Sequence, residues 1–471
     1  MSSWAAKLQR LPAGVAERIG ERIPAGAQPS ASSSSNASAD ASDDVPGAVP
    51  AASTKTDVLA ALREKMERLK ASSRHAPARA PSLPVRAESP DTLPFLAECD
   101  GRLWVRRMVL GPSHRVGVVP VDLALTADPA FLALLALDPA VGACSFRNAL
   151  YLDLETTGLA QGSVPCLVGL MHAQGEELVL EQLLLKNLDD EGVMLERIAE
   201  RVAAASVLVT FNGKTFDWPL LRSRFTMNRL PVPTPPTHLD LLHVARRVHR
   251  SADVPRSIKL QRLEIDLLGL ERVGDIPGSE IGAAYWHWLR TGEDSTMRAV
   301  VDHNAWDVYA MAALVGLYGR PLEEELAPGS ARGLHDFLPQ VAWTLKRAGA
   351  MGDARKVADR AVRDDGGTLA YLTRAEIAKA LRDRDLALAD FEQVLALESL
   401  GIRKPNLGPG TRSSTKARLE LAKLYEHHVR AFGKAHEVAT GGTGEDEDAL
   451  ARRLSRLARK ATKTEKKAPS T

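Results

Sequence analysis

Apolar and polar positions along the chain predict buried strands alternating with amphipathic helices, and one of these strands carries acidic side chains. The segment Ala149–Leu159 starts with a run of large apolar residues, which is typical of a buried strand. Asp153 and Glu155 interrupt this run two positions apart, so on a strand both project from the same face. Since burying like charges without a cation is costly, the segment predicts a divalent metal site near the strand end. The alternative is an exposed edge strand with two solvated acids.

The remaining pattern predicts an α/β protein. Before the acidic strand, Leu103–Leu110 and Val116–Val121 are predicted as short strands and Asp128–Leu137 as a helix. After it come a hairpin, a helix, a strand and further helices, at Cys166–His172 with Leu178–Leu185, Asp189–Ala204, Val207–Phe211, Trp218–Phe225 and Thr296–Tyr318. A strand, a hairpin, a helix, a strand and a helix in this order are typical of an α/β fold.

Two more acids lie near the ends or on the faces of these predicted elements. Asp217 is expected near the start of the helix that follows Val207–Phe211, where an aspartate can also serve simply as an N-cap. Asp307 lies four residues after His303 on the Thr296–Tyr318 helix, so the two side chains share a face. An ordinary polar pair near the surface would show the same spacing.

Taken together, four carboxylates on separate elements favour a metal centre. They are Asp153, Glu155, Asp217 and Asp307. Oxygen ligands suit Mg²⁺ or Mn²⁺, whereas zinc would favour Cys or more His. Two such ions about 3.5–4 Å apart can hold the attacking and leaving oxygens of a phosphodiester displacement. His303 is then the candidate that orients or deprotonates the attacking water.

The composition is typical of a globular protein, but it does not indicate which partners the protein binds. The chain has 471 residues, 45% hydrophobic and 25% charged, which is ordinary for a globular protein of two or three domains. Lys and Arg number 61 against 59 Asp and Glu, so a nucleic-acid surface would have to be a local basic patch. Cys99, Cys144 and Cys166 form no CxxC pair, which favours a reducing compartment. With neither a signal-peptide core nor an apolar run of about 18 residues, we expect a cytoplasmic protein without a membrane partner.

Three motifs in the α/β region resemble those of the DEDD exonuclease superfamily, which has a ribonuclease-H-like fold. The closer resemblance is to the YprB-type ribonuclease-H-like domain, and it covers about Ala149–Tyr318. It implies a ribonuclease-H-like mixed β-sheet flanked by helices and metal-dependent cleavage from a 3′ end of DNA or RNA. The three motifs are Asp153-Leu-Glu155-Thr-Thr-Gly, Phe211-Asn-Gly-Lys-Thr-Phe-Asp217 and His303-Asn-Ala-Trp-Asp307, and the likeness extends to His238-Leu-Asp240, Leu260-Gln-Arg-Leu-Glu264 and Asp275-Ile-Pro-Gly278.

By this resemblance the four acids are the ligands of two ions, and Asp153 bridges both. His303 departs from the family pattern. Histidine-type members place the His five residues before the last Asp, while tyrosine-type members have Tyr four before it, and here a His has the tyrosine-type spacing. One helical position rotates a side chain by about 100°, so this spacing bears directly on the role of His303 as general base. Asp240 is either an extra ligand or, as we favour, a structural acid at a strand end.

Candidate nucleic-acid contacts lie in and around the motifs, because an exonuclease must hold its strand through phosphates and stacked bases. For each basic residue the alternative is a solvated surface position, and for each tryptophan a core position. The candidates at the motifs and in the basic stretch between them are Thr156, Asn212, Lys214, Arg256 and Lys259. Further candidates are Arg222, Arg224, Arg246, Arg262, Trp286 and Trp288.

The two ends of the chain predict different structures. Ala25–Ser53 is dominated by Ser, Ala, Pro and Asp, which predicts disorder, although short helices are expected at Ala5–Arg22 and Thr56–Lys70. The last third predicts helical pairs that resemble a short tetratricopeptide-like array. Lys346 to Lys379 is a shift of 33 residues, close to the period of about 34 of that repeat. Such an array would offer a groove to a protein partner or brace the nuclease domain.

These patterns predict five regions. They are a largely disordered arm at 1–92, a small extension packing on the nuclease domain at 93–148, the ribonuclease-H-like domain at 149–320, the tetratricopeptide-like repeats at 334–440 and a charged tail at 441–471. The leading function is a two-metal 3′-to-5′ exonuclease. The alternatives are a structure-specific endonuclease on the same fold and a non-catalytic scaffold that works through the helical repeats. DNA and RNA are not separated as substrates.

Overall fold

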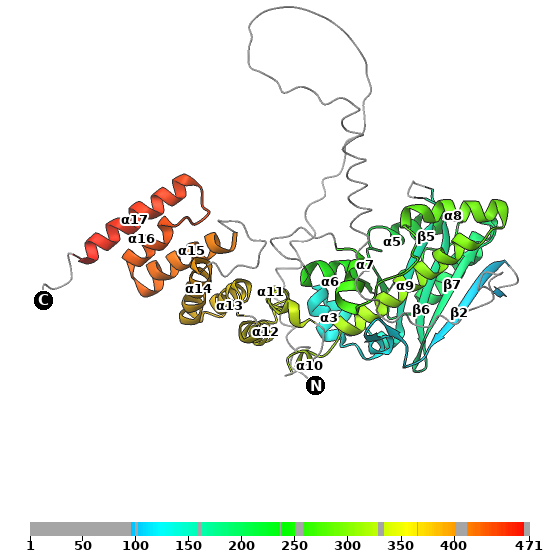
Figure 1. Cartoon of the computed structure of the whole chain (residues 1–471), viewed down its shortest axis with the longest axis horizontal. Coiled ribbons are helices and arrows are strands. Elements are labelled where there is room, and N and C mark those ends of the chain that lie inside the picture. Colours follow the sequence, from blue (N-terminus) through cyan, green and yellow to red (C-terminus); the bar gives the residue numbers. More distant parts are fainter. Residues whose placement is uncertain are drawn as a thin grey trace, which may run out of the picture. The chain divides into compact units, whose positions relative to one another are not determined.

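A seven-stranded mixed sheet forms the centre of the α/β part of the chain (Figure 1). The structure is a computed structural model that describes residues 96–98, 102–158, 162–235, 237–249, 258–327, 334–364, 366–400 and 412–465. The arm predicted at 1–92 and its two helices lie outside the described residues, as does Arg256. In sheet order the strands are β1 (Leu96–Glu98), β2 (Leu103–Leu110), β7 (Glu177–Leu185), β6 (Pro165–Gln174), β5 (Ala149–Thr156), β8 (Val207–Thr210) and β9 (His238–Asp240).

The sheet changes direction at β5, the strand that carries the first two acids. From β1 to β5 the neighbours pair antiparallel, with Asp153 opposite Gly169 of β6. From β5 through β8 to β9 they pair parallel. Carboxyl ends of parallel strands meet at one edge of a sheet, so the segments that follow β5, β8 and β9 lie together there.

Helices cover both faces of this sheet. Successive side chains of β5 point to opposite faces and therefore contact different helices. Leu150 and Leu152 belong to the core shared with α4 (Glu191–Ala204) and α5 (Asp217–Met227). The opposite face packs against α8 (Gly278–Thr291) and α9 (Ser295–Tyr318). Asp153 and Glu155 alternate with the leucines and therefore face α9. The other helices of this part are α3 (Pro129–Ala136), α6 (Leu241–Val248) and α7 (Leu260–Leu263).

The segment before β5 belongs to the same sheet. β1 and β2 extend it beyond β7, so the extension expected at 93–148 contributes strands as well as packing. The single strand predicted at Val116–Val121 is wrong. Two short strands, β3 (Arg115–Val116) and β4 (Val119–Pro120), form a hairpin there because Gly117 turns the chain with a φ of 60°, and a 3-10 helix begins at Val121.

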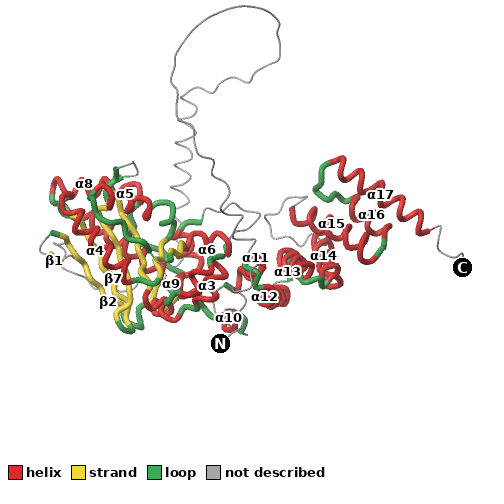
Figure 2. Tube along the Cα trace, turned by 180° about the vertical axis from the view of Figure 1, so that it is seen from behind, coloured by secondary structure: helices red, strands yellow, loops and turns green. Residues whose placement is uncertain are grey.

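Beyond the α/β part the described chain is helical (Figure 2). The helices are α10 (Leu322–Glu325), α11 (Leu338–Arg347), α12 (Met351–Asp364), α13 (Thr368–Ala380), α14 (Arg384–Ser399), α15 (Arg412–Leu424), α16 (Phe432–Thr440) and α17 (Glu447–Glu465). The predicted pairs are present, with Lys346 on α11 and Lys379 on α13.

The segment expected as a charged tail at 441–471 contains the helix α17. α17 spans 19 residues, and its Leu457 is fully buried against α14, α15 and α16. Through Leu457, this largely basic helix packs onto the hydrophobic core of the last helices. Among the helices that the structure describes, none combines the length and the apolar character needed to cross a lipid bilayer.

Candidate functional site

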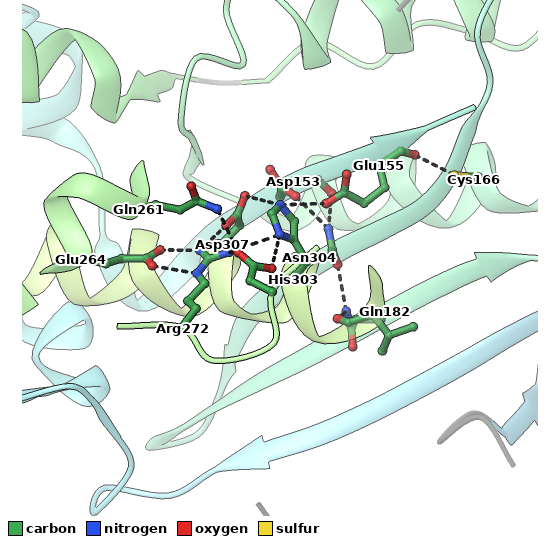
Figure 3. A network of polar contacts seen from close by, with 12 residues as sticks. Asp153, Glu155, Cys166, Gln182, Gln261, Glu264, Arg272, His303, Asn304 and Asp307 are labelled. Atoms are coloured by element: carbon green, nitrogen blue, oxygen red, sulfur yellow. Dashed lines mark hydrogen bonds and ion pairs between the residues drawn. The ribbon is translucent and has the colours of Figure 1, made fainter. Parts of the chain in front are cut away.

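Three elements bring the predicted acids to one edge of the sheet. Asp153 and Glu155 lie near the end of β5, and Asp217 is the first residue of α5, just after β8. The N-cap of α5 is Phe216. Asp217 therefore does not cap the helix, which was the alternative role that the sequence allowed for it. α9 crosses the other side of β5 and carries His303 and Asp307 into the same space (Figure 3).

The acids affect one another's charge. Burial raises the pKa of Asp153 well above its usual value, and repulsion from Asp307 and Asp217 adds to the shift. Burial likewise raises the pKa of Glu155, with further contributions from the charges of Asp153, Asp307 and Asp217. Burial also raises the pKa of Asp217 to about 7, against backbone hydrogen bonds that lower it. A cation bound between these carboxylates would lower their pKa values and favour their charged forms.

A chain of amides holds Asp153 in place. Gln182 of β7 is fully buried and donates to Val301 O at 2.8 Å and to Asn304 Oδ1 at 2.9 Å. Because Asn304 Oδ1 accepts that bond, Asn304 Nδ2 faces β5, where it donates to Asp153 Oδ2 at 2.8 Å. This bond lowers the pKa of Asp153 and opposes the effect of burial. Neither amide was singled out from the sequence, since an isolated Gln in a strand carries no local signal.

Gly169 permits this close approach of α9 to the sheet. A Cβ at Gly169 would lie 2.4 Å from Asn304 Oδ1 and 2.8 Å from Val308 Cγ2. Any other residue would force α9 to shift or the Asn304 and Val308 side chains to turn away. The glycine therefore has a steric role, opposite Asp153 in the β5–β6 pairing.

His303 faces the acids from α9. Its Nδ1 lies 2.6 Å from Asp275 Oδ1, while its Nε2 lies 3.9 Å from Glu155 Oε1 and 3.8 Å from Asp307 Oδ2. Asp275 thus orients the ring, and Nε2 remains directed at the carboxylates. The altered spacing still places the imidazole among the acids, and its role as a base stays a prediction.

Arg272 joins the acids from the loop between α7 and α8. Its Nε donates to Glu264 Oε2 at 2.7 Å, and its Nη2 donates to both Glu264 Oε1 and Asp307 Oδ1. Nη1 lies 3.4 Å from Asp275 Oδ2, and the guanidinium lies over the ring of Trp306. The side chain is only 4% exposed. Sequence reasoning missed this residue, because nothing near it in the chain marks it as part of the site.

The donor set fits divalent cations of the magnesium type. Oxygens of Asp153, Glu155 and Asp217 converge, and their raised pKa values mark a place where positive charge is lacking. In the geometry as it stands, no three His, Cys, Asp or Glu side chains of the described residues are already arranged as a metal-ligand set.

A cavity of about 320 Å³ opens beside the acids. Three predicted nucleic-acid contacts, Asn212, Arg246 and Lys259, line it. Asn212 has a φ of 70°, a conformation that Asn tolerates better than most residues, and its backbone amide donates to Asp240 Oδ1 at 2.8 Å. The full lining is Asp153, Phe211, Asn212, Leu242, Arg246, Ile258, Lys259, Leu260 and Asp307.

Other predicted contacts have different surroundings. The backbone amide of Lys214 donates to Asp240 Oδ2 and its side chain is exposed, while Thr156 Oγ1 donates to Gly158 O at 2.7 Å. Arg224 is buried in an ion pair with Glu191, which makes it a structural residue. Trp288 lies in the core and Trp286 is 39% exposed.

Asp240 has the structural role that we favoured over metal binding. It ends β9 and accepts from the backbone amides of Asn212, Lys214 and Leu242. Three donors on one carboxylate hold the loop after β8 against the start of α6, and thereby set the position of Asp217.

Comparisons with known proteins agree with this fold. A family model described as RNase_H superfamily matches residues 150–318, which supports a nuclease-type activity. The uncharacterized protein YprB of Bacillus subtilis (strain 168) is 31% identical over 304 residues, covering 62% of this chain and 68% of YprB. A family B DNA polymerase from the hyperthermophilic archaeon Pyrobaculum calidifontis superposes with a TM-score of 0.30 at 16% identity over 46% of this chain. That superposition spans only 29% of the polymerase and is too weak to support an argument.

Proposed function

The chain belongs to the YprB family, and from this premise we propose that it is a nuclease that removes nucleotides from a 3′ end with the help of divalent cations. The observation that carries the proposal is the meeting of Asp153, Glu155 and Asp217, all with raised pKa values, at one edge of a ribonuclease-H-like sheet. A fold has no structural need to bring together three repelling carboxylates, one buried and two partly buried. Their cost is understandable where a cation binds.

Mg²⁺ or Mn²⁺ bound by Asp153, Glu155 and Asp217, with Asp307 beside them, would supply Lewis-acid activation of a water and of the phosphate. The protein's own groups do the rest. Asp275 holds the His303 ring so that Nε2 is available to accept a proton from the attacking water. The amide of Asn304 keeps Asp153 oriented and favours its charged form.

The cavity beside the acids supports a terminal nucleotide as the bound group. Its volume of about 320 Å³ lies at the lower end of the range of small-ligand sites, roughly 300–1,000 Å³. Phe211 and Leu260 offer apolar surface to a base, and Lys259 and Arg246 are exposed cations for phosphates. Asn212 carries an amide that can bond the terminal sugar or base. The same contacts serve DNA and RNA.

The test uses purified full-length protein with 5′-labelled single- and double-stranded DNA and RNA, in Mg²⁺ or Mn²⁺. We expect a ladder of products shortened from the 3′ end and no cutting of circular DNA. Asp153→Asn should lower the rate by at least about 10³-fold, since a charged ligand is lost. Asp128→Asn, which changes an N-cap of α3 away from the site, should keep wild-type activity.

Other outcomes would count against the proposal in distinct ways. Cutting of the circular substrate would favour the structure-specific endonuclease. If no substrate is cut with either ion, while the helical region α11–α17 captures a protein partner, the scaffold function gains and catalysis is excluded. In that scaffold function, the helical pairs would act as a tetratricopeptide-like array that binds a protein partner.

A further inference from the structure

We propose that the guanidinium of Arg272 permanently occupies the cation position beside Asp307, so that the site takes one divalent ion where the family resemblance implies two. The inference deepens the proposed function and rests on it. It concerns a residue that the sequence motifs do not include and that links Glu264 with Asp307 in the polar network (Figure 3).

Arg272 is anchored as a fixed part of the site. Nε and Nη2 form a two-pronged contact with Glu264, whose side chain is only 1% exposed. Asp275, Nδ1 of His303 and the ring of Trp306 lie against the rest of the guanidinium. A paired arrangement of this kind is geometrically specific for arginine, and breaking it would leave Glu264 buried without a partner.

The decisive detail is that one nitrogen serves two acids. Nη2 donates to Glu264 Oε1 and to Asp307 Oδ1. As long as the contact with Glu264 persists, Nη2 stays beside Asp307, and a divalent ion that approached Asp307 Oδ1 would meet a positive charge already in contact. Like charges at such a distance in a partly buried site repel strongly.

The other acids lack such a cation. Within the described chain, no Lys or Arg nitrogen lies within 4 Å of the carboxylates of Asp153, Glu155 or Asp217. Asp153 receives only the neutral amide of Asn304. The place left for an ion is therefore between these three acids. A guanidinium remains charged at every relevant pH, so the charge beside Asp307 is present with or without bound metal.

The experiment counts bound ions in the full-length protein. Mn²⁺ is titrated calorimetrically, and electron paramagnetic resonance of the saturated protein reports whether two Mn²⁺ ions are coupled. We expect one ion per chain without coupling in the wild type, lost in Asp153→Asn. The double variant Glu264→Gln with Arg272→Gln removes both buried charges together, so that neither is left unpaired, and it should bind two coupled ions.

A matched pair controls for loss of a buried arginine–glutamate contact as such. Arg224 makes the same two-pronged contact with Glu191, at 2.6 and 2.5 Å, outside the site. Glu191→Gln with Arg224→Gln should therefore leave the count at one. Circular dichroism establishes that each variant is folded.

The results separate this inference from the proposed function. Two coupled ions in the wild type overturn the role of Arg272 but leave a metal-dependent nuclease standing, and this measurement needs no variant. A double variant that folds and still binds one ion also overturns it. If the wild type binds no Mn²⁺ at all, the inference fails together with the metal dependence of the proposed function.

Discussion

Asn304 donates a hydrogen bond of 2.8 Å to Oδ2 of Asp153, and through it helix α9 reaches strand β5 at the centre of the acidic cluster. The bond joins residues 151 positions apart. Gln182 sets the direction of the Asn304 amide, since its own donor occupies Asn304 Oδ1. Burial thus disfavours the charged form of Asp153, whereas the neutral amide of Asn304 favours it and fixes the orientation of the carboxylate.

Asn304→Ala should weaken Mn²⁺ binding by about 10–100-fold, as expected for loss of a group that orients a metal ligand. The free energy of unfolding should also fall by about 1–3 kcal/mol, because Gln182 loses a buried partner. Calorimetric titration and chemical denaturation measure the two effects. Asn228→Ala is the control, because Asn228 donates to Glu191 at 2.8 Å outside the site. It should lower stability without changing Mn²⁺ affinity, and equal affinity losses in both variants would contradict the role given to Asn304.

Asp153→Asn should stabilise the metal-free protein. Burial and repulsion from Asp307 and Asp217 raise the pKa of Asp153, so its charge opposes folding at pH 8. A neutral side chain of the same shape removes that cost, and we expect a gain on the order of 1–3 kcal/mol in EDTA. The same variant should lose the stabilisation that added Mn²⁺ gives to the wild type. Asp128→Asn, at an N-cap where both residues are favoured, should change little. Thermal unfolding that places Asp153→Asn below the wild type in EDTA would refute the prediction.

The stability difference between Asp217→Asn and the wild type should depend on pH. The pKa of Asp217 rises from 3.8 to about 7 in the folded protein, mainly through burial. Between these values the folded state keeps a proton that the unfolded state has released, so the contribution of Asp217 to stability falls as the pH rises. The variant should therefore match the wild type below about pH 4 and gain on it up to about pH 7, where the difference levels off.

The quantity to measure, in EDTA, is the difference in the free energy of unfolding between Asp217→Asn and the wild type. The stability of either protein alone also depends on groups whose contribution changes with pH in the opposite direction. Burial lowers the pKa of His238 and His249 to about 4 in the folded protein. As the pH falls, the unfolded state therefore takes up protons on these residues before the folded state does, so their contribution to stability rises with pH. These histidines are unchanged by Asp217→Asn and cancel in the comparison. A difference that stays constant from pH 4 to pH 7 would show that Asp217 is not desolvated.

Gly169→Ala should disturb the site without touching an acid. Its Cβ would lie 2.4 Å from Asn304 Oδ1, so α9 must shift or Asn304 must turn away from Asp153. We expect a loss of about 1–3 kcal/mol in the free energy of unfolding and weaker Mn²⁺ binding. Gly192→Ala is the matched control, since a Cβ on this glycine of α4 meets nothing within 4 Å and favours the helix by up to about 1 kcal/mol. Wild-type stability and Mn²⁺ affinity in Gly169→Ala would show that the close approach is not required.

The sequence could locate the acids because each lies in a motif readable over a few neighbouring residues. Alternation along Ala149–Thr156 shows that Asp153 and Glu155 share a face, and spacing along one helix shows the same for His303 and Asp307. The succession of strands, hairpin and helices along the α/β part follows from similar local signals. The main error arose where one residue redirects the chain, as Gly117 does between β3 and β4.

Only the tertiary structure decided which polar residues act on those acids. Gln182 and Asn304 are separated by 122 positions, and Arg272 and Asp307 by 35, so no local pattern relates them. Whether an arginine is a solvated surface residue or a buried cation beside a carboxylate depends on what other segments bring to it. Periodicity and motif spacing are properties of neighbouring residues, and they determined the elements and the acidic edge. Charge balance and hydrogen bonding inside the site are properties of contacts across the fold, because desolvation and Coulomb interactions depend on distance in space rather than along the chain.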